Sequence, residues 1–354
     1  MMAYVEFVAI EEIHAAALRA LPADVAAYLE AGAGSESTLR ANREAFGQWV
    51  IRPRPMSGVS QPDMSATVLG IPLAVPILTS PFGGDALFHP DGQLAVARAN
   101  AACGTASIVP EVGSFSYEAV RAAAPGAARI AQIHPYQSFD VVAKRIRAAG
   151  YDALCVTVDC PQTGWRVRSR MSGFRPDIRV WAGNDLGDGG PSVSRMFAVP
   201  VGADNPSWTW ERLAEAAGRA ELPWIAKGIL TGPAADSALR AGASAILVSN
   251  HGGRQVDPCP ASLDALPEVV AAVAGRAPVL LDSGIRSGAD VLIALALGAD
   301  AVVIGRLAAY GLAAAGEAGV RSVIELLAAE LRTLMVLAGL PDVQSITRDV
   351  VARR

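Results

Sequence analysis

The sequence has 354 residues, of which 52% are hydrophobic and 18% are charged, with a formal net charge of −4 at pH 7. A chain of this length and composition can bury a large core, and we predict one barrel domain over residues 1–354. The slight negative charge and the lack of any basic block argue against a nucleic-acid partner.

Four cysteines, Cys103, Cys155, Cys160 and Cys259, show neither a CxxC pair nor the spacing of zinc ligands. We therefore predict reduced thiols, no metal site and a reducing, cytoplasmic location. The first 20 residues carry acidic side chains within an apolar pattern and lack a basic segment, which predicts an amphipathic helix and not a signal peptide. No apolar run is long enough to span a bilayer, so we expect no membrane partner.

The chain begins with three predicted helices, and from residue 71 onward short apolar strands alternate with helices. The initial helices are predicted at 11–21, 22–32 and 36–46; the strands at 71–80, 104–110, 128–133, 151–159, 224–229, 244–250, 277–284 and 301–306; and the later helices at 91–104, 116–126, 138–150, 233–243, 263–275, 288–300 and 307–316. These strand-then-helix units predict a closed α/β fold, the (β/α)8 TIM barrel. A doubly wound open sheet is the alternative, and it fits less well because no GxGxxG motif follows the first strand.

Two segments do not belong to this alternation. Residues 168–208 are rich in Gly, Pro, Ser and charge without a clear period, which predicts a long active-site loop after strand four. Residues 320–340 show the apolar period of a C-terminal helix that packs against the barrel wall or a partner subunit.

Polar residues follow the apolar core of most predicted strands. Because the carboxyl ends of barrel strands converge on one mouth, this pattern predicts a polar ligand of some size. Each residue taken alone also fits a satisfied strand end or a surface side chain. The residues are Gln132, Thr157, Asp159, Lys227, Ser249, His251, Asp282, Gly305 and Arg306.

The stretch 246–257 is a predicted buried strand that runs into the loop SNHGGRQ. Its glycines allow a sharp turn and a close approach to a ligand, while His251 supplies a titratable base and Arg254 a cationic fork. The alternative is an ordinary glycine turn with both side chains in solvent.

The last two predicted strands end in the sequences DSGIR and IGR, at 282–286 and 304–306. Barrels often bind phosphate after these strands through backbone N–H groups and a helix N-terminus, and arginines add charge-assisted contacts. The pattern predicts a phosphate without identifying the molecule that carries it. Glycine turns with solvent-facing arginines are the alternative.

With these motifs, the sequence resembles the FMN-dependent α-hydroxy acid oxidase and dehydrogenase family, which includes glycolate, lactate and mandelate enzymes. The matching segments are AKGI at 226–229, VSNHGGRQ at 248–255, DSGIRSG at 282–288 and ALGAD at 296–300, together with YLEAGA at 28–33, residues 46–54, HPDG at 89–92, TVD at 157–159 and GWR at 164–166. The resemblance therefore covers nearly the whole chain outside the long loop.

The resemblance implies a role for each matching residue. His251 matches the base that takes a proton from the substrate, Asp159 the carboxylate that stabilises its protonated form, and Lys227 a cation beside the flavin. Arg166 and Arg254 match a clamp for the substrate carboxylate. Tyr28, His134 and Tyr136 stand at other substrate positions. Pro81, Phe82, Gly83, Gln132, Thr157, Lys227 and Ser249 match positions around the isoalloxazine, and Asp282, Ser283, Gly284, Ile285, Arg286, Gly305 and Arg306 match the ribityl and phosphate site.

The sequence departs from the family pattern at several positions near the expected flavin and substrate. His134 replaces a substrate-binding tyrosine, for which Tyr136 could partly substitute because it points to the same side of an extended chain. Pro110-Glu111 replaces a serine pair, and Pro81-Phe82-Gly83 replaces Pro-Thr-Ala. Ser283 replaces a glycine and could add a hydroxyl contact to the phosphate chain.

The resemblance implies an enzyme that uses FMN to oxidise a 2-hydroxy acid to the 2-keto acid. We expect O2 as electron acceptor because no haem domain, quinone-docking helix or membrane segment is visible, although the family also uses other acceptors. One alternative is an altered FMN reaction, such as an oxidative decarboxylation or isomerisation of a bulkier natural-product intermediate. Another is a non-catalytic flavin- or phosphate-binding barrel. The family also implies a homo-oligomer, with a tetramer expected.

Overall fold

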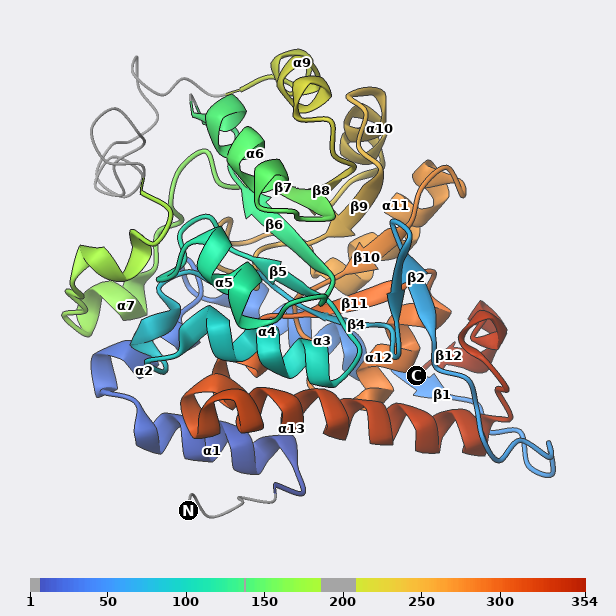
Figure 1. The fold of residues 1–354 in the computed structure, drawn as a ribbon. Coiled ribbons are helices and arrows are strands. Elements are labelled where there is room, and N and C mark those ends of the chain that lie inside the picture. Colours follow the sequence, from blue (N-terminus) through green and yellow to red (C-terminus); the bar gives the residue numbers. More distant parts are fainter. Residues whose placement is uncertain (1–6, 137, 186–207) are drawn as a thin grey trace.

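In a computed structural model that describes residues 7–136, 138–185 and 208–354, eight parallel strands close into a barrel (Figure 1). Closure is made by the last and first strands, where Ile304 pairs with Thr79. This confirms the predicted TIM barrel. The barrel strands are β4 (Ile77–Thr79), β5 (Ser107–Val109), β6 (Arg129–Ile133), β7 (Ala153–Thr157), β8 (Trp224–Ile229), β9 (Ala245–Val248), β10 (Val279–Leu281) and β11 (Ala301–Ile304).

The strand side chains are buried on both faces and divide into two cores. Leu78, Ile108 and Leu247 belong to a core inside the barrel, whereas their neighbours Ile77 and Val109 belong to the core under the helices. This alternation follows from the period of two in a strand. Such doubly buried strands read as continuous apolar runs, which is why the sequence pattern found them.

Helices surround the barrel, and the longest of them lies beside α1 (Figure 1). The helices that follow the barrel strands are α4 (Gly92–Ala102), α5 (Tyr117–Ala123), α6 (Phe139–Ala148), α9 (Trp210–Ala220), α10 (Gly232–Arg240), α11 (Ser262–Val273), α12 (Gly288–Ala296) and α13 (Arg306–Ala338). The last contains both helices predicted at its positions, joined by a kink at Ala315 and Gly316. No described helix is long and apolar enough to cross a membrane.

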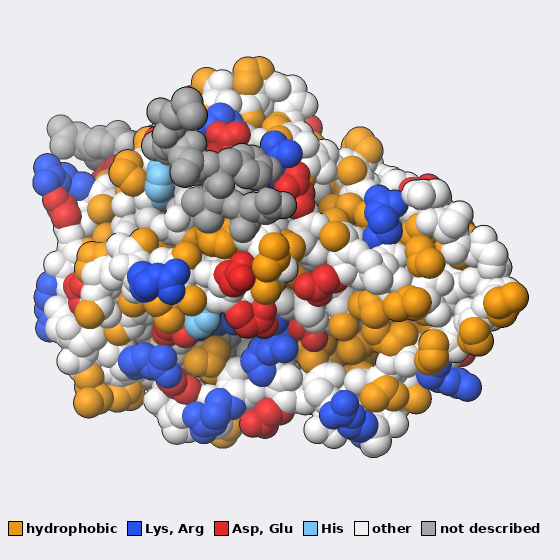
Figure 2. Space-filling view, turned by 90° about the horizontal axis from the view of Figure 1, so that it is seen from below, with side chains coloured by type: hydrophobic (Ala, Val, Ile, Leu, Met, Phe, Trp, Pro, Cys, Tyr) orange, Lys and Arg blue, Asp and Glu red, His pale blue; other side chains and the backbone are white. Residues whose placement is uncertain are grey.

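The N-terminal segment forms the three predicted helices, α1 (Ile10–Ala20), α2 (Ala23–Glu30) and α3 (Ser37–Gly47). Asp257, in the loop after β9, ties them to the barrel because its carboxylate accepts the Thr38 N–H at 2.7 Å and the Ser35 N–H at 2.9 Å. The strand β1 (Trp49–Ile51) pairs with β12 (Val351–Arg353), which joins this segment to the end of the fold. On the side of α1 and α13, charged side chains of both signs are scattered among apolar ones (Figure 2).

Two predicted segments differ from the structure. Residues 71–80 are not one strand, because Ile71–Leu73 (β3) pairs antiparallel with Ala66–Val68 (β2) before Pro76 leads into β4. The hairpin closes the inner core, to which Val68, Ile71 and Leu73 belong. The predicted loop 168–208 contains the end of α7 (Val167–Met171) and a 3-10 turn, η2 (Ile178–Trp181), while 186–207 lie outside the described residues.

Candidate active site

The carboxyl ends of the strands open into a cavity of about 400 Å³, a volume suited to a cofactor-sized ligand. Two predicted site residues, Asp159 and Ser249, lie just behind its wall, where each contacts a residue that lines it. The predicted residues that line the cavity are Tyr28, Pro81, Phe82, Gly83, Gln132, His134, Tyr136, Thr157, Arg166, Lys227, His251, Arg254, Asp282, Ser283, Gly284, Ile285, Arg286, Gly305 and Arg306. The convergence predicted from the strand ends is therefore what the fold produces.

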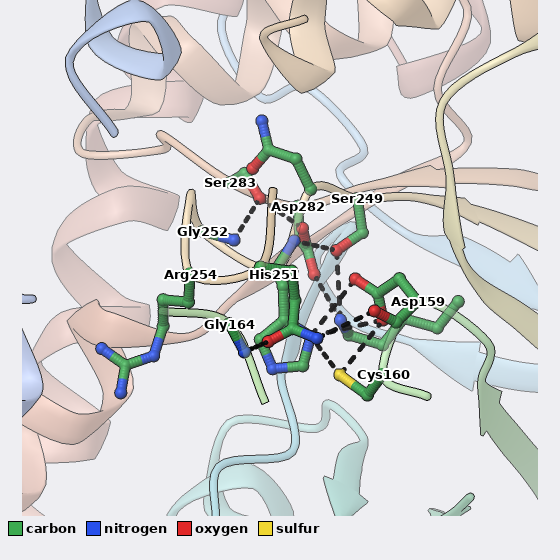
Figure 3. A network of polar contacts seen from close by, with 12 residues as sticks. Asp159, Cys160, Gly164, Ser249, His251, Gly252, Arg254, Asp282 and Ser283 are labelled. Carbon is green, nitrogen blue, oxygen red and sulfur yellow. Dashed lines mark hydrogen bonds and ion pairs between the residues drawn. The ribbon is translucent and has the colours of Figure 1, made fainter. Parts of the chain in front are cut away.

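His251 and Asp159 form an imidazole–carboxylate pair, with Nδ1 of His251 3.3 Å from both carboxylate oxygens (Figure 3). Burial by itself raises the pKa of Asp159, but the interaction with His251 and the positive charge of Lys227 hold it at about 2, so the carboxylate is ionised at neutral pH. Burial lowers the pKa of His251 below its ordinary 6.5, against the opposing effect of Asp159. The pair thus presents a neutral base whose protonated form has a carboxylate beside it.

The loop that carries His251 has a strained backbone. His251, Gly252 and Gly253 have φ angles of +59°, +65° and +72°. The left-handed region costs a non-glycine residue of order 1–3 kcal/mol, so surrounding contacts must hold His251 in place. Asn250 provides them, because its Oδ1 accepts the Gly253 N–H at 3.0 Å and its Nδ2 donates to Oδ1 of Asn42 on α3 at 2.7 Å.

Cys160 is a site residue that the sequence analysis missed. Its Sγ lies 3.3 Å from Nδ1 of His251 and 3.6 Å from Oδ1 of Asp159. Burial and the nearby Asp159 raise the pKa of this thiol, so it remains protonated. The three side chains place potential metal-ligand atoms within 4.8 Å of one another. Cys160 directly follows the predicted site residue Asp159, and this position in the sequence is the feature that could have identified it.

The guanidinium groups of Arg166 and Arg254 both border the cavity. Neither forms an ion pair with a carboxylate among the described residues. Burial and repulsion by Arg166 lower the pKa of Arg254 to about 9. Arg166 and Arg254 are both half-buried; an anion stabilises two neighbouring cations in such a wall, and their planar forks suit a carboxylate.

Arg254 also supports the N-terminal segment. Its Nη1 donates to the carbonyls of Tyr28 at 2.9 Å and Ala31 at 2.7 Å, and its guanidinium carbon lies 4.9 Å from the centre of the Tyr28 ring. Its side chain accordingly points away from Asp159 (Figure 3). Tyr28 in turn stacks on Phe174 with ring centres 4.4 Å apart, so the described start of the long loop covers this wall.

Lys227 lies at the centre of the site and is only 3% exposed. Its Nζ donates to Ser249 Oγ at 3.1 Å and lies 3.5 Å from Oδ2 of Asp282. Burial alone lowers the pKa of this ammonium, but Asp282 and Asp159 more than compensate and raise it. The ammonium therefore stays charged in a position where it can stabilise a negative charge on a ligand.

The phosphate prediction falls on the start of α13. Gly305 precedes this helix and has no side chain to cap its first N–H groups, whereas α12 is closed by a Ser287–Asp290 capping box. An uncapped helix N-terminus that borders a cavity attracts an anion. Burial lowers the pKa of Arg286 and of Arg306, and the two guanidiniums repel each other. An anion in the cavity that both residues line would reduce this penalty.

Two predicted phosphate contacts have other partners. Arg306 donates through Nε to Leu29 O at 3.0 Å, through Nη1 to Gly252 O at 2.9 Å and through Nη2 to Ala31 O at 2.9 Å. Its side chain therefore braces the loops, and two of its five guanidinium N–H groups remain for a phosphate, together with its backbone N–H. The Ser283 hydroxyl accepts from Gly252 N at 2.9 Å and donates to Asp282 at 2.7 Å, so it also supports the His251 turn.

Of the residues predicted around the isoalloxazine, all but Ser249 line the cavity, near β4, β6, β7 and β8. At Gly83 an added Cβ would lie 2.5 Å from the carbonyl oxygen of Val112, so the departure to glycine there follows from loop packing. Gln132 is held by the N–H of Glu111, which its Oε1 accepts at 3.2 Å. Glu111 is a second site residue that the sequence analysis did not place, although it was noted as a departure.

The cavity has an anion site at one end, a buried ammonium at its centre and a neutral base beside the ammonium. The phosphate of FMN fits the anion site, and its electron-accepting ring fits beside the ammonium. A small acid fits with its α-carbon at the neutral base and its carboxylate at Arg166 and Arg254. The fold and site thus define an FMN-binding barrel oxidoreductase.

Comparison with known proteins supports this class of enzyme. Residues 17–353 match the model of the FMN-dependent dehydrogenase family, and the chain belongs to this family. A peroxisomal (S)-2-hydroxyacid oxidase of Arabidopsis thaliana is 41% identical over 98% of this chain and 96% of its own length. An L-lactate oxidase of a Nostoc species is 42% identical over 90% of this chain and 91% of its own. The structure of a mandelate oxidase matches with a TM-score of 0.89 and 37% identity over 99% of both chains.

Proposed function

We propose that this enzyme oxidises a 2-hydroxy acid to the 2-keto acid, with O2 as the electron acceptor. The observation that carries the proposal is the pairing of a neutral His251, backed by Asp159, with two cavity-lining arginines that have no carboxylate partner among the described residues. The relatives named 2-hydroxyacid, lactate and mandelate oxidases support the same substrate class.

In this proposal each side chain has one task. Arg166 and Arg254 hold the substrate carboxylate, which orients the α-carbon toward the base. His251 takes one proton through Nε2, while Asp159 at Nδ1 stabilises the imidazolium that forms. Lys227 offsets negative charge near the cofactor. When bound, FMN supplies the two-electron acceptor, and O2 then takes up two electrons and two protons as H2O2.

Anaerobic mixing of the FMN-loaded protein with a panel of 2-hydroxy acids tests the proposal. At least one acid should bleach the flavin absorbance near about 450 nm, and oxygen should restore it with one H2O2 per keto acid. His251→Ala should keep FMN bound but remove bleaching. If FMN is bound and no acid bleaches it, the proposed function is wrong.

Two further properties are part of the proposal. A cytoplasmic location is supported by four cysteines that are all free in the described structure. A homotetramer is expected from the family resemblance. Cell fractionation checks the first, and light scattering of the purified FMN-bound protein, with a mass of four 36.6 kDa chains expected, checks the second.

A further inference from the structure

Asp159, Cys160 and His251 bring three metal-ligating atoms of different kinds together beside the cavity. A carboxylate oxygen, a sulfur and an imidazole nitrogen lie within 4.8 Å of one another. Figure 3 shows the three side chains directed toward one another, with Cys160 on the loop after β7 and His251 on the loop after β9. No such group was predicted from the sequence, because His251 follows Cys160 by 91 residues.

The distances within this group match the edges of a tetrahedral zinc site. With bonds of about 2.0–2.3 Å from Zn²⁺ to nitrogen, oxygen and sulfur and tetrahedral angles, neighbouring ligand atoms lie about 3.3–3.6 Å apart. Nδ1 of His251 lies 3.3 Å from both carboxylate oxygens of Asp159 and 3.3 Å from Sγ of Cys160. Sγ lies 3.6 Å from Oδ1 of Asp159. A cation can therefore bind all three atoms with little movement of the side chains.

The kinds of ligand atom determine which cation binds. Thiolate and imidazole ligands suit Zn²⁺, whereas Mg²⁺ and Ca²⁺ bind mainly oxygen. Three protein ligands leave a fourth position for water, as in zinc sites that are open on one side. Cys160 and His251 line the cavity, and the side chains of His251 and Asp159 are 28% and 14% exposed, so an ion can reach the group from the cavity.

The charges around the group also fit a divalent cation. Zn²⁺ deprotonates a thiol that it coordinates, so Asp159 and Cys160 together supply two negative charges. Lys227 and Arg166 are positive neighbours that weaken the binding of a cation. Asp282, 3.5 Å from the ammonium of Lys227, offsets part of this repulsion. The ion and its two anionic ligands together carry no net charge, which suits a half-buried site.

We propose that Asp159, Cys160 and His251 bind Zn²⁺ and that the bound ion inhibits the enzyme. The ion bonds to the Cys160 thiolate, to one Asp159 oxygen and to Nδ1 of His251, and the thiol proton leaves to solvent. Nδ1 then carries no proton, so the proton of the neutral imidazole lies on Nε2. Nε2 takes the substrate proton in the proposed function, and in this form it cannot accept one. The inhibition therefore rests on the proposed function, whereas the binding of Zn²⁺ does not.

Calorimetric titration of the FMN-loaded, metal-free enzyme with Zn²⁺ tests the site. The wild-type enzyme should bind one ion per chain and release about one proton, which titrations in buffers of different ionisation enthalpy measure. Cys160→Ala should lower the affinity about 100-fold, because a ligand is lost. Cys103→Ala and Cys259→Ala, at two other half-buried cysteines, are the matched controls and should keep the wild-type affinity. Mg²⁺ should not compete with Zn²⁺.

Stopped-flow reduction of the flavin by the fastest acid of the panel, without oxygen, tests the inhibition. Saturation of the wild-type enzyme with Zn²⁺ should slow reduction about 100-fold or more while FMN stays bound, because the general base is blocked. A chelator should restore the rate. Cys160→Ala at the same Zn²⁺ concentration should keep the rate that it shows without metal. Cys160→Ser replaces this variant if it does not fold, since a hydroxyl is not among the usual zinc ligands.

The outcomes separate the site, the inhibition and the proposed function. Equal affinity for Zn²⁺ in the wild-type enzyme and Cys160→Ala overturns the site, as does a loss of the same size in Cys103→Ala or Cys259→Ala. Tight binding that leaves the rate of flavin reduction unchanged overturns the inhibition. If no acid reduces the flavin, the proposed function fails, and the calorimetric titration still decides whether the three side chains bind Zn²⁺.

Discussion

Asp159→Asn probes the stabilisation of the protonated base most directly. The substitution keeps the size of the side chain but removes a full charge 3.3 Å from Nδ1 of His251. At an effective dielectric constant of about 20, two unit charges at this distance interact with roughly 5 kcal/mol. The amide oxygen still accepts a hydrogen bond and retains part of this energy. We expect a loss of about 3 kcal/mol, or roughly 100-fold in the rate of flavin reduction.

Stopped-flow measurement of anaerobic flavin reduction, with the fastest acid of the panel, checks this value. Affinity for a non-reacting carboxylate should stay close to wild type, because the arginine clamp is untouched. Asp140→Asn, an exposed aspartate paired with Arg219 on the outer helices, is the matched control. A rate within about threefold of wild type, with FMN bound, would refute the idea that Asp159 stabilises the imidazolium.

Other predictions concern the clamp, the cofactor site and pH. Arg254→Lys should weaken carboxylate binding about 10- to 100-fold in calorimetry, because one ammonium cannot reproduce a planar fork; an unchanged affinity would exclude Arg254 from the clamp. Gly284→Ala should destabilise the protein by about 2 kcal/mol or more and lower its FMN content, because φ is +98° and a Cβ would lie 2.4 Å from Asn42 O; wild-type urea unfolding would contradict this. Lys227→Met should lower the free energy of unfolding by about 3–5 kcal/mol in the same assay, because Asp282 loses its buried ammonium partner. The control is Lys144→Met, at an exposed lysine. If Lys227→Met destabilises the protein less than this control, the Lys227–Asp282 pair does not stabilise the fold. Finally, kcat/KM should fall as the pH drops through the pKa of His251, which lies below 6.5, because the protonated imidazole cannot accept a proton. If kcat/KM already falls at a pH above 6.5, another group controls the reaction.

Residues at strand ends could be predicted because parallel strands point their carboxyl ends to one mouth whatever the details of their loops. This is why the sequence predicts that Lys227, His251 and Asp282 lie together, as they do in the cavity. The resemblance then supplied roles that position alone could not, such as those of Arg166 and Tyr28.

Side-chain direction could not be predicted in the same way. Arg306 was assigned to a phosphate, yet its guanidinium turns back to carbonyls of α2 and the His251 loop, a choice set by local packing. Glu111 and His134 were noted as separate departures, and their 2.8 Å contact became visible only with both loops in place. The break at Pro76 was hidden because β3 and β4 are both apolar.

The carbonyls at the end of α2 accept hydrogen bonds from Arg254 and Arg306, which follow their acceptors by 226 and 277 residues. On the ribosome, α2 is made long before the arginines whose side chains hold these carbonyls. At about 5–20 residues per second, the helix waits roughly 15–55 s for these partners. The enzyme's cavity is therefore completed only after β11 has been made, and we expect that a nascent chain halted before β11 does not hold its cofactor.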